Sequence, residues 1–197
     1  MQTAKAVVQD PAQNQSVETR ALFDSGSQRS YITENLAKLL ELTPIEEETL
    51  TLCTFGSKDI KKIPSNVVDL DVRTIDNKSI RMRVNTTPCI TRDFTKSCLA
   101  PSVDRSRFES LQFADDYFSE EPNSSIQLLI GNDYYFKFIL QDRRVVRDGL
   151  YLIVKCRVVY LLSRCVWEST GCVLCVSICL WSALWLSLLT NCVAARG

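Results

Sequence analysis

The sequence predicts a mostly β domain with one short helix, followed by an apolar C-terminal segment. Three observations support this: short segments alternate between β-branched and polar residues, turn-forming residues separate them, and charged residues disappear near the C-terminus. A chain of 197 residues is long enough for one domain of ordinary size and an appendage. We therefore expect one main domain over residues 1–155 and a tail over residues 156–197.

The first two strands are predicted to form a hairpin. Residues 4–9, with the sequence AKAVVQ, and residues 17–23, with the sequence VETRALF, have strand composition and flank a polar loop. Thr33 then precedes a short amphipathic segment and is a suitable N-cap, so we expect a helix from Glu34 to about Leu40. Its leucines are expected on one packed face: Leu36, Leu39 and Leu40.

An antiparallel meander is predicted after this helix, from strands over residues 49–54, 63–72 and 79–84, with a turn over residues 76–78. The first two of these strands flank a glycine-containing hairpin tip, which is formed by Phe55, Gly56, Ser57 and Lys58. The tip is either a mobile flap that closes over a site or an ordinary exposed loop.

An inserted loop and an apolar run are expected next. Residues from about 86 to 125 mix charged residues, prolines and serines, which favours an inserted loop. The apolar run Ile126–Ile130 is either a strand covered on both faces or a helix segment. Gly131, directly after it, permits the close approach of another backbone.

The tail has three interpretations. No charged residue occurs from Ser169 to Ala195, so a segment over about residues 171–193 is long enough to span a bilayer. Basic residues precede this segment, and a spanning helix would therefore leave the main domain in the cytosol. The tail is alternatively non-homologous read-through past the natural end of an exon, without a selected fold, or a buried globular helix.

The composition excludes several classes of function. The chain contains no histidine, so we expect neither a Ser-His-Asp nor a Cys-His nucleophile, nor a catalytic zinc site with imidazole ligands. Lysine plus arginine equals aspartate plus glutamate at 23 each, which leaves no basic footprint for nucleic acid. We therefore expect no nucleic-acid partner.

The nine cysteines predict neither a disulfide framework nor a metal site. Their number is odd, most lie in the final quarter, and no secretory signal is seen at the N-terminus, so we expect a reducing, cytoplasmic environment. Cys172 and Cys175 form a C-x-x-C pair, but no second pair completes a zinc site, and a buried apolar role is favoured. We expect no cofactor and no metal.

Asp24-Ser25-Gly26 is the motif most suited to catalysis. An apolar strand ends just before Asp24, which would hold its carboxylate partly desolvated at the mouth of the core, although an ordinary turn has the same pattern. Two carboxylates that share one proton can activate a water and protonate a carbonyl without histidine. The chain offers one such aspartate, so a second copy of the chain must supply the other.

Three segments of the chain resemble a known family: LFDSGSQRSYITENLAKLLEL, TLCTFGSKD and LQFADDYFSEEPNSSIQLLIGNDYYFKFI. They are similar to the retropepsin-like peptidase domain of Pao/BEL retrotransposon polyproteins, over about residues 3–153. The resemblance implies an all-β, retropepsin-like and pepsin-related half-barrel, and an aspartic peptidase that processes the element's own polyprotein.

The same resemblance implies roles for individual residues. Asp24 is the catalytic acid, supported by the loop residues Ser25, Gly26 and Ser27. Phe55 to Lys58 lie in the flap. An apolar-Gly segment braces the active-site loop and consists of Leu128, Leu129, Ile130 and Gly131.

The chain departs from the family pattern after about residue 155, and neither a capsid-like region nor a polymerase accompanies the domain, so we expect a fragment of a genomic copy. Our leading hypothesis is an aspartic endopeptidase that cuts extended peptides or a polyprotein as a homodimer. The alternative is a catalytically inactive binding or dimerisation module of the same fold, tethered to a membrane through the tail.

Overall fold

The computed structural model describes residues 2–12, 15–53, 60–91, 113–114, 125–146, 151–164, 167–168 and 171–172. The predicted flap residues Phe55 to Lys58 lie outside these ranges, as do most of the predicted inserted loop and residues 173–197 of the tail. Within the described ranges, no helix has the length and apolar character needed to cross a membrane.

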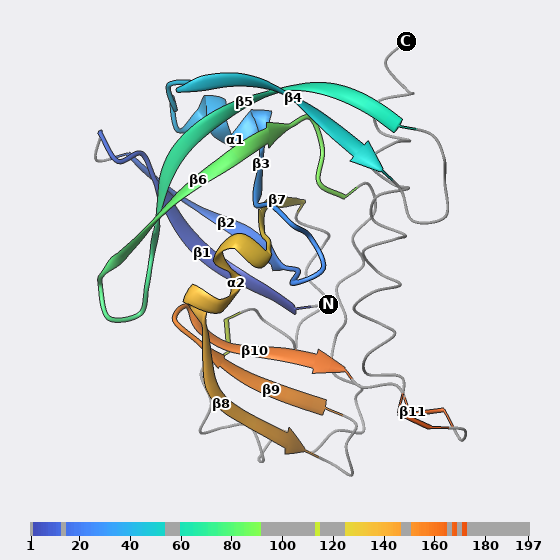
Figure 1. Cartoon of the computed structure of the whole chain (residues 1–197). Helices are drawn as coiled ribbons and strands as arrows, with labels where there is room; N and C mark the ends of the chain where they lie inside the picture. Colours follow the sequence, from blue (N-terminus) through green and yellow to red (C-terminus); the bar gives the residue numbers. More distant parts are fainter. Residues whose placement is uncertain are drawn as a thin grey trace.

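The described chain is mostly β, as predicted (Figure 1). Its elements in chain order are β1 (Gln2–Gln9), β2 (Ser16–Phe23), β3 (Tyr31–Thr33), α1 (Glu34–Leu39), β4 (Glu46–Cys53), β5 (Ile60–Arg73), β6 (Ser79–Thr87), β7 (Ile126–Ile130), α2 (Asn132–Phe138), β8 (Ile139–Val146), β9 (Tyr151–Cys156), β10 (Val159–Arg164), β11 (Trp167–Glu168) and β12 (Gly171–Cys172).

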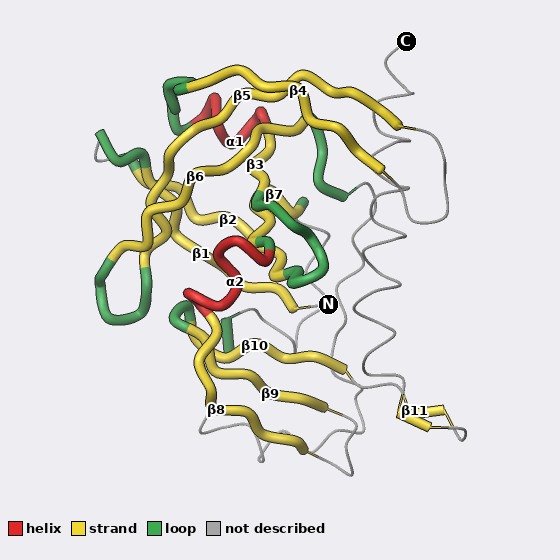
Figure 2. The backbone as a smooth tube through the Cα atoms, viewed as in Figure 1, coloured by secondary structure: helices red, strands yellow, loops and turns green. Residues whose placement is uncertain are grey.

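Six strands close into a barrel, in the order β1-β2-β7-β3-β6-β5 (Figure 2). The ring closes because β5 also pairs with β1, where Val8 lies opposite Val72. Two neighbouring pairs in the ring are parallel, β2 with β7 and β3 with β6. Closure removes the unpaired edges that an open sheet of these strands would have. β4 lies outside the ring and pairs with β5.

A second sheet, of β10, β9 and β8, packs next to the barrel, and β10 contacts β1 (Figure 1). The β9–β10 turn is anchored by its backbone. The amide of Arg157 donates to the carbonyl of Phe138 over 2.8 Å, and the Arg157 carbonyl accepts from the amide of Ile75 over 2.9 Å. Cys156, Val158 and Leu161 join the main core cluster, although the predicted domain boundary falls at residue 155. The division of the chain into domain and tail stays a prediction.

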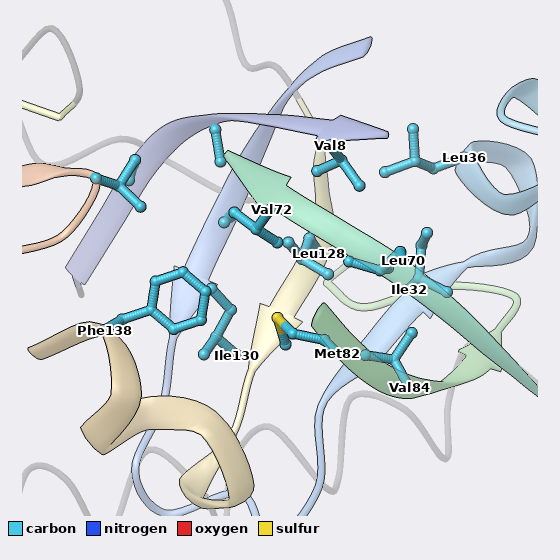
Figure 3. Close-up of a cluster of buried hydrophobic side chains, with 14 of the residues drawn as sticks. Val8, Ile32, Leu36, Leu70, Val72, Met82, Val84, Leu128, Ile130 and Phe138 are labelled. Atoms are coloured by element: carbon cyan, nitrogen blue, oxygen red, sulfur yellow. The ribbon is translucent and has the colours of Figure 1, made fainter. Parts of the chain in front are cut away.

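The core fills the barrel with side chains from alternate strand positions. Because successive side chains of a strand point to opposite faces, every second residue of β1, β5 and β6 faces inward. Figure 3 shows this cluster, to which α1 and α2 contribute one labelled residue each: Val8, Ile32, Leu36, Leu70, Val72, Met82, Val84, Leu128, Ile130 and Phe138. On β7, Leu128 and Ile130 pack in this cluster while Leu129 packs in a second one. The prediction of a strand covered on both faces is confirmed.

Helix α1 forms where it is predicted. The side-chain oxygen of Thr33 accepts a hydrogen bond from the backbone amide of Leu36. This amide lies in the first turn of the helix, where backbone donors have no partner within the helix itself. Leu36 and Leu40 are buried, but Leu39 is 53% exposed, so its assignment to the packed face is wrong. The buried arc of this short helix is centred between Leu36 and Ala37, and Leu39 lies beyond its border.

Several elements are not predicted from the sequence. They are β3, α2 and the sheet of β8, β9 and β10. In addition, Thr86 and Thr87 belong to β6 rather than to the inserted loop, because they pair with Ile32 and Thr33 of β3. Among the described residues the domain therefore has a second short helix, α2, beside the predicted one.

A substitution at Phe138 tests how much the packing of α2 against the barrel contributes to stability. Its ring is fully buried and meets the ring of Phe23 edge to face, with centroids 5.8 Å apart. We expect Phe138→Ala to lower the free energy of unfolding by about 3–5 kcal/mol. Phe136→Ala, on the same helix but 68% exposed, is the matched control and should stay within about 0.5 kcal/mol of the parent. Equal effects in urea denaturation would contradict this packing.

Candidate active site

Asp24 lies directly after β2, at the point where this strand leaves its parallel partner β7. Phe23, the last residue of β2, lies opposite Ile130, the last residue of β7. The amide of Asp24 then donates to the carbonyl of Ile130 over 3.0 Å. The backbone of Asp24 is therefore fixed to the end of a buried strand.

The Asp24 carboxylate is half-buried in a tight turn. Its Oδ1 accepts from the amide of Gly26 over 2.9 Å, and the Asp24 carbonyl accepts from the amide of Ser27 over 3.2 Å. Burial raises the pKa of Asp24 above its ordinary value, and hydrogen bonds from the Gly26 and Ser27 amides oppose this rise. The group therefore holds a proton more readily than a solvated aspartate does.

The other predicted loop residues are brought together around Asp24. Ser25 is half-buried and Gly26 is exposed, whereas Ser27 is buried. The Ser27 hydroxyl donates to the carbonyl of Arg29 over 2.7 Å, and the Ser27 carbonyl accepts from the amide of Asn132 over 2.7 Å. Ser27 thus closes the turn on one side and connects it to α2 on the other.

Gly131 packs directly against this loop. Its amide donates to the hydroxyl of Ser30 over 2.9 Å. A β-carbon at Gly131 would overlap the carbonyl group of Arg29 and stand 3.0 Å from the carbonyl oxygen of Ser27. The close backbone approach that the sequence predicts at Gly131 is therefore present, and the position has no room for a larger residue.

Asp133 is a site residue to which the sequence reasoning gives no role. Its Oδ1 accepts from the Ser30 hydroxyl over 2.7 Å, and its Oδ2 accepts from the Ser30 amide over 3.0 Å. Ser30 is almost fully buried, so its amide requires such a partner. The signal that could have found Asp133 is its place two residues after Gly131, within the segment LQFADDYFSEEPNSSIQLLIGNDYYFKFI that resembles the peptidase family.

A polar network connects the same loop to β4 and β6. The Arg29 guanidinium, through Nη1, donates to Glu48 Oε1 on β4 and to Asn85 Oδ1 on β6. The Asn85 side-chain amide also donates to Glu48 Oε1 and to Ser65 Oγ on β5. In addition, the backbone amide of Asn85 donates to the carbonyl of Ser30 over 3.1 Å. β4 and β5 are the strands that lead into the predicted flap, whose tip lies outside the described residues.

A substitution at Gly131 directly tests the contact between this residue and the loop that carries Asp24. In Gly131→Ala the methyl group would collide with backbone atoms, so the loop must shift as a whole. We expect a loss of about 1–3 kcal/mol in the free energy of unfolding. Asn132→Ala, at the adjacent exposed position, keeps the backbone bond to Ser27 and should change the stability by no more than about 0.5 kcal/mol. Urea denaturation of both variants measures these changes. Equal stabilities of Gly131→Ala and Asn132→Ala would contradict the tight contact at Gly131.

Comparison with curated proteins and with solved structures finds no match for this chain. A family model with the description "Putative peptidase (DUF1758)" matches residues 6–171. The match includes the Asp24 turn, the β4–β5 strands and the Gly131–Asp133 segment, and it covers more than half of the chain. The chain therefore belongs to this peptidase family.

Proposed function

We propose that this chain is an aspartic endopeptidase domain of the retropepsin type that acts as a homodimer. The observation that carries the proposal is the half-buried Asp24 carboxylate, held on a turn that β7 and α2 fix in place. The peptidase family supports the general class of activity. The resemblance of the Asp24 and Gly131 motifs supports the finer assignment to Pao/BEL retrotransposon polyproteins.

We place the second carboxyl in another copy of the chain, because the neighbouring carboxylates that the structure describes are already engaged. Among the described residues, two other carboxylates contact the residues that follow Asp24, those of Asp133 and Glu48. Asp133 accepts two hydrogen bonds from Ser30, and Glu48 accepts from Arg29 and Asn85. Neither is free to share a proton with Asp24. Two-fold symmetry would instead bring one Asp24 from each protomer to the axis.

The proposed reaction is general acid–base hydrolysis of a peptide bond. Of the paired Asp24 carboxyls, one is ionised and takes a proton from a water, which attacks the carbonyl carbon. The other is protonated and gives its proton to the carbonyl oxygen. The tetrahedral intermediate then collapses: the departing nitrogen receives the proton that came from the water, and a hydroxyl group of the intermediate returns a proton to the second carboxyl, which restores the shared proton. The raised pKa of Asp24 favours the shared proton, and a like charge across the axis would raise one pKa further.

The proposed substrate is an extended peptide, held between the Asp24 turn and the predicted flap, within a polyprotein of a retrotransposon. We place this activity in the cytoplasm, with the C-terminal segment as an alternative membrane anchor. A catalytically inactive dimerisation module of the same fold is the competing function, and the experiment below separates the two.

Asp24→Asn is the direct test of catalysis in the full chain. We expect the variant to lose about 10²–10⁴-fold in kcat/KM on a peptide library, because the amide can neither accept the proton of water nor donate one from a carboxyl. The parent should show a bell-shaped pH profile, because activity needs one protonated and one ionised carboxyl. Its specific activity should rise with protein concentration if the dimer is the active form.

Asp76→Asn is the matched control, since Asp76 is exposed in the turn between β5 and β6. It should retain the activity of the parent. Activity that survives Asp24→Asn would remove Asp24 from the mechanism. A parent that dimerises but cleaves no peptide between acidic and neutral pH would favour the inactive module.

The raised pKa of Asp24 also predicts an effect on stability. The folded state disfavours the ionised form of Asp24, so this carboxylate lowers the stability of the protein at neutral pH. Below about pH 3.9 the carboxyl is protonated in both the folded and the unfolded state, and the destabilising effect disappears. Asp24→Asn should therefore raise Tm at pH 7, and the gain should shrink as the pH falls through the folded-state pKa.

Asp76→Asn should behave in the opposite sense. Hydrogen bonds from Thr74 and Lys78 lower the pKa of Asp76, so its ionised form is favoured in the fold and its removal costs stability at neutral pH. Thermal melts of both variants from pH 3 to pH 7 measure the two trends. A Tm at pH 7 that falls in Asp24→Asn would contradict the burial of its charge.

A further inference from the structure

We infer that Asp133 is a positioning residue, which sets the rate of peptide hydrolysis by holding the loop of Asp24 through Ser30. The inference rests on the proposed peptidase function and adds a residue on which that function depends. The hydrogen bonds that carry it form a series from the Asp133 carboxylate to the backbone of Asp24.

The Asp133 carboxylate binds both donors of Ser30. Its Oδ1 accepts from the Ser30 hydroxyl over 2.7 Å, and its Oδ2 accepts from the Ser30 backbone amide over 3.0 Å. Ser30 is 1% exposed, whereas Asp133 lies at the surface. A buried donor that loses its partner destabilises the conformation that buries it. Asp133 therefore favours the conformation in which Ser30 points inward.

Ser30 transmits this restraint to the segment that binds Asp24. Because the Ser30 hydroxyl donates its proton to Asp133, its oxygen accepts from the Gly131 amide, over 2.9 Å. The residue before Gly131 is Ile130, whose carbonyl accepts from the Asp24 amide over 3.0 Å. The Asp133–Ser30 pair thus fixes the strand end to which the backbone of Asp24 is attached.

The donors around this side chain require a carboxylate. In addition to the two donors of Ser30, the backbone amide of Tyr134 donates to Oδ1 of Asp133 over 3.0 Å. A carboxylate accepts at both oxygens, whereas an asparagine side chain has one acceptor oxygen and one NH₂ donor. In Asp133→Asn the NH₂ group would face a backbone N–H in either orientation, that of Ser30 or that of Tyr134. The substitution therefore breaks the hydrogen bonding with almost no change in shape.

The first test measures kcat and KM of the full chain on a peptide that the parent cleaves, chosen from a library. We expect Asp133→Asn to lower kcat by about 10–100-fold, because a small displacement of Asp24 misaligns it with the reacting groups. KM should change by less than about twofold, because the inference gives Asp133 no contact with the substrate. An unchanged kcat, or a raised KM at an unchanged kcat, would overturn the inference.

A double-mutant cycle tests whether Asp133 acts through Ser30. Ser30→Ala removes the hydroxyl that Asp133 binds and should also lower kcat. The double variant should lose less than the product of the two single losses, because both substitutions break the same hydrogen bond. Losses that multiply would mean that Asp133 acts independently of Ser30, which contradicts the inference.

Asp71→Asn is the matched control. The Asp71 carboxylate also accepts at both oxygens, in this case from Arg81, and it lies on β5, outside the contacts of the Asp24 loop. This variant should keep kcat within about twofold of the parent. A loss as large as that of Asp133→Asn would show that the effect is not specific to the Asp24 loop.

Amide hydrogen exchange gives a readout that needs no activity. Asp133→Asn should speed the exchange of the Asp24 amide by about tenfold or more, while the protected amides of β5 and β6 stay unchanged. An Asp24 amide that Asp133→Asn does not affect would refute the restraint.

The same measurement separates the inference from the proposed function. A parent that cleaves no peptide fails the proposed function, and the exchange of the Asp24 amide then still decides whether Asp133 holds the loop. If Asp133→Asn does not fold, the Ser30 amide of the parent decides. Strong protection of this amide supports the restraint, and exchange at the rate of an unstructured peptide refutes it.

Discussion

The site depends on one contact, in which four consecutive residues at the end of β7 and the start of α2 bind the loop that follows β2. The Ile130 carbonyl accepts from Asp24, the Gly131 amide donates to Ser30, the Asn132 amide donates to Ser27, and the Asp133 carboxylate accepts from Ser30. The absence of a side chain at Gly131 is what allows this approach. The partial burial that raises the pKa of Asp24 occurs within a loop that this contact holds.

Elements specified by local sequence are the ones that could be predicted. The first hairpin, helix α1 with its Thr33 cap, the β4–β5–β6 meander and the apolar strand β7 are all present, because alternation, capping and turn residues act over a few neighbouring positions. The Asp24 motif was recognisable for a similar reason. An acid after an apolar strand and before Ser-Gly specifies a turn that holds its carboxylate at the border of the core.

Elements specified by distant partners could not be predicted. β3 has only three residues, and it is a strand because it lies between β6 and β7, which are far from it in sequence. The role of Asp133 depends on Ser30, which is 103 positions earlier in the chain. The network of Arg29, Glu48 and Asn85 likewise joins three separate segments. Sequence periodicity contains no information about such pairings.

The long separation between Ser30 and Asp133 has a consequence for protein synthesis. During translation, Asp24 and its loop are synthesised well before residues 130–133, which hold this loop in the folded domain. Until α2 has emerged, the loop of the nascent chain that carries Asp24 lacks the backbone contacts that hold it in the folded domain. The order of translation therefore delays the final shape of this loop until residues 130–133 have also been synthesised.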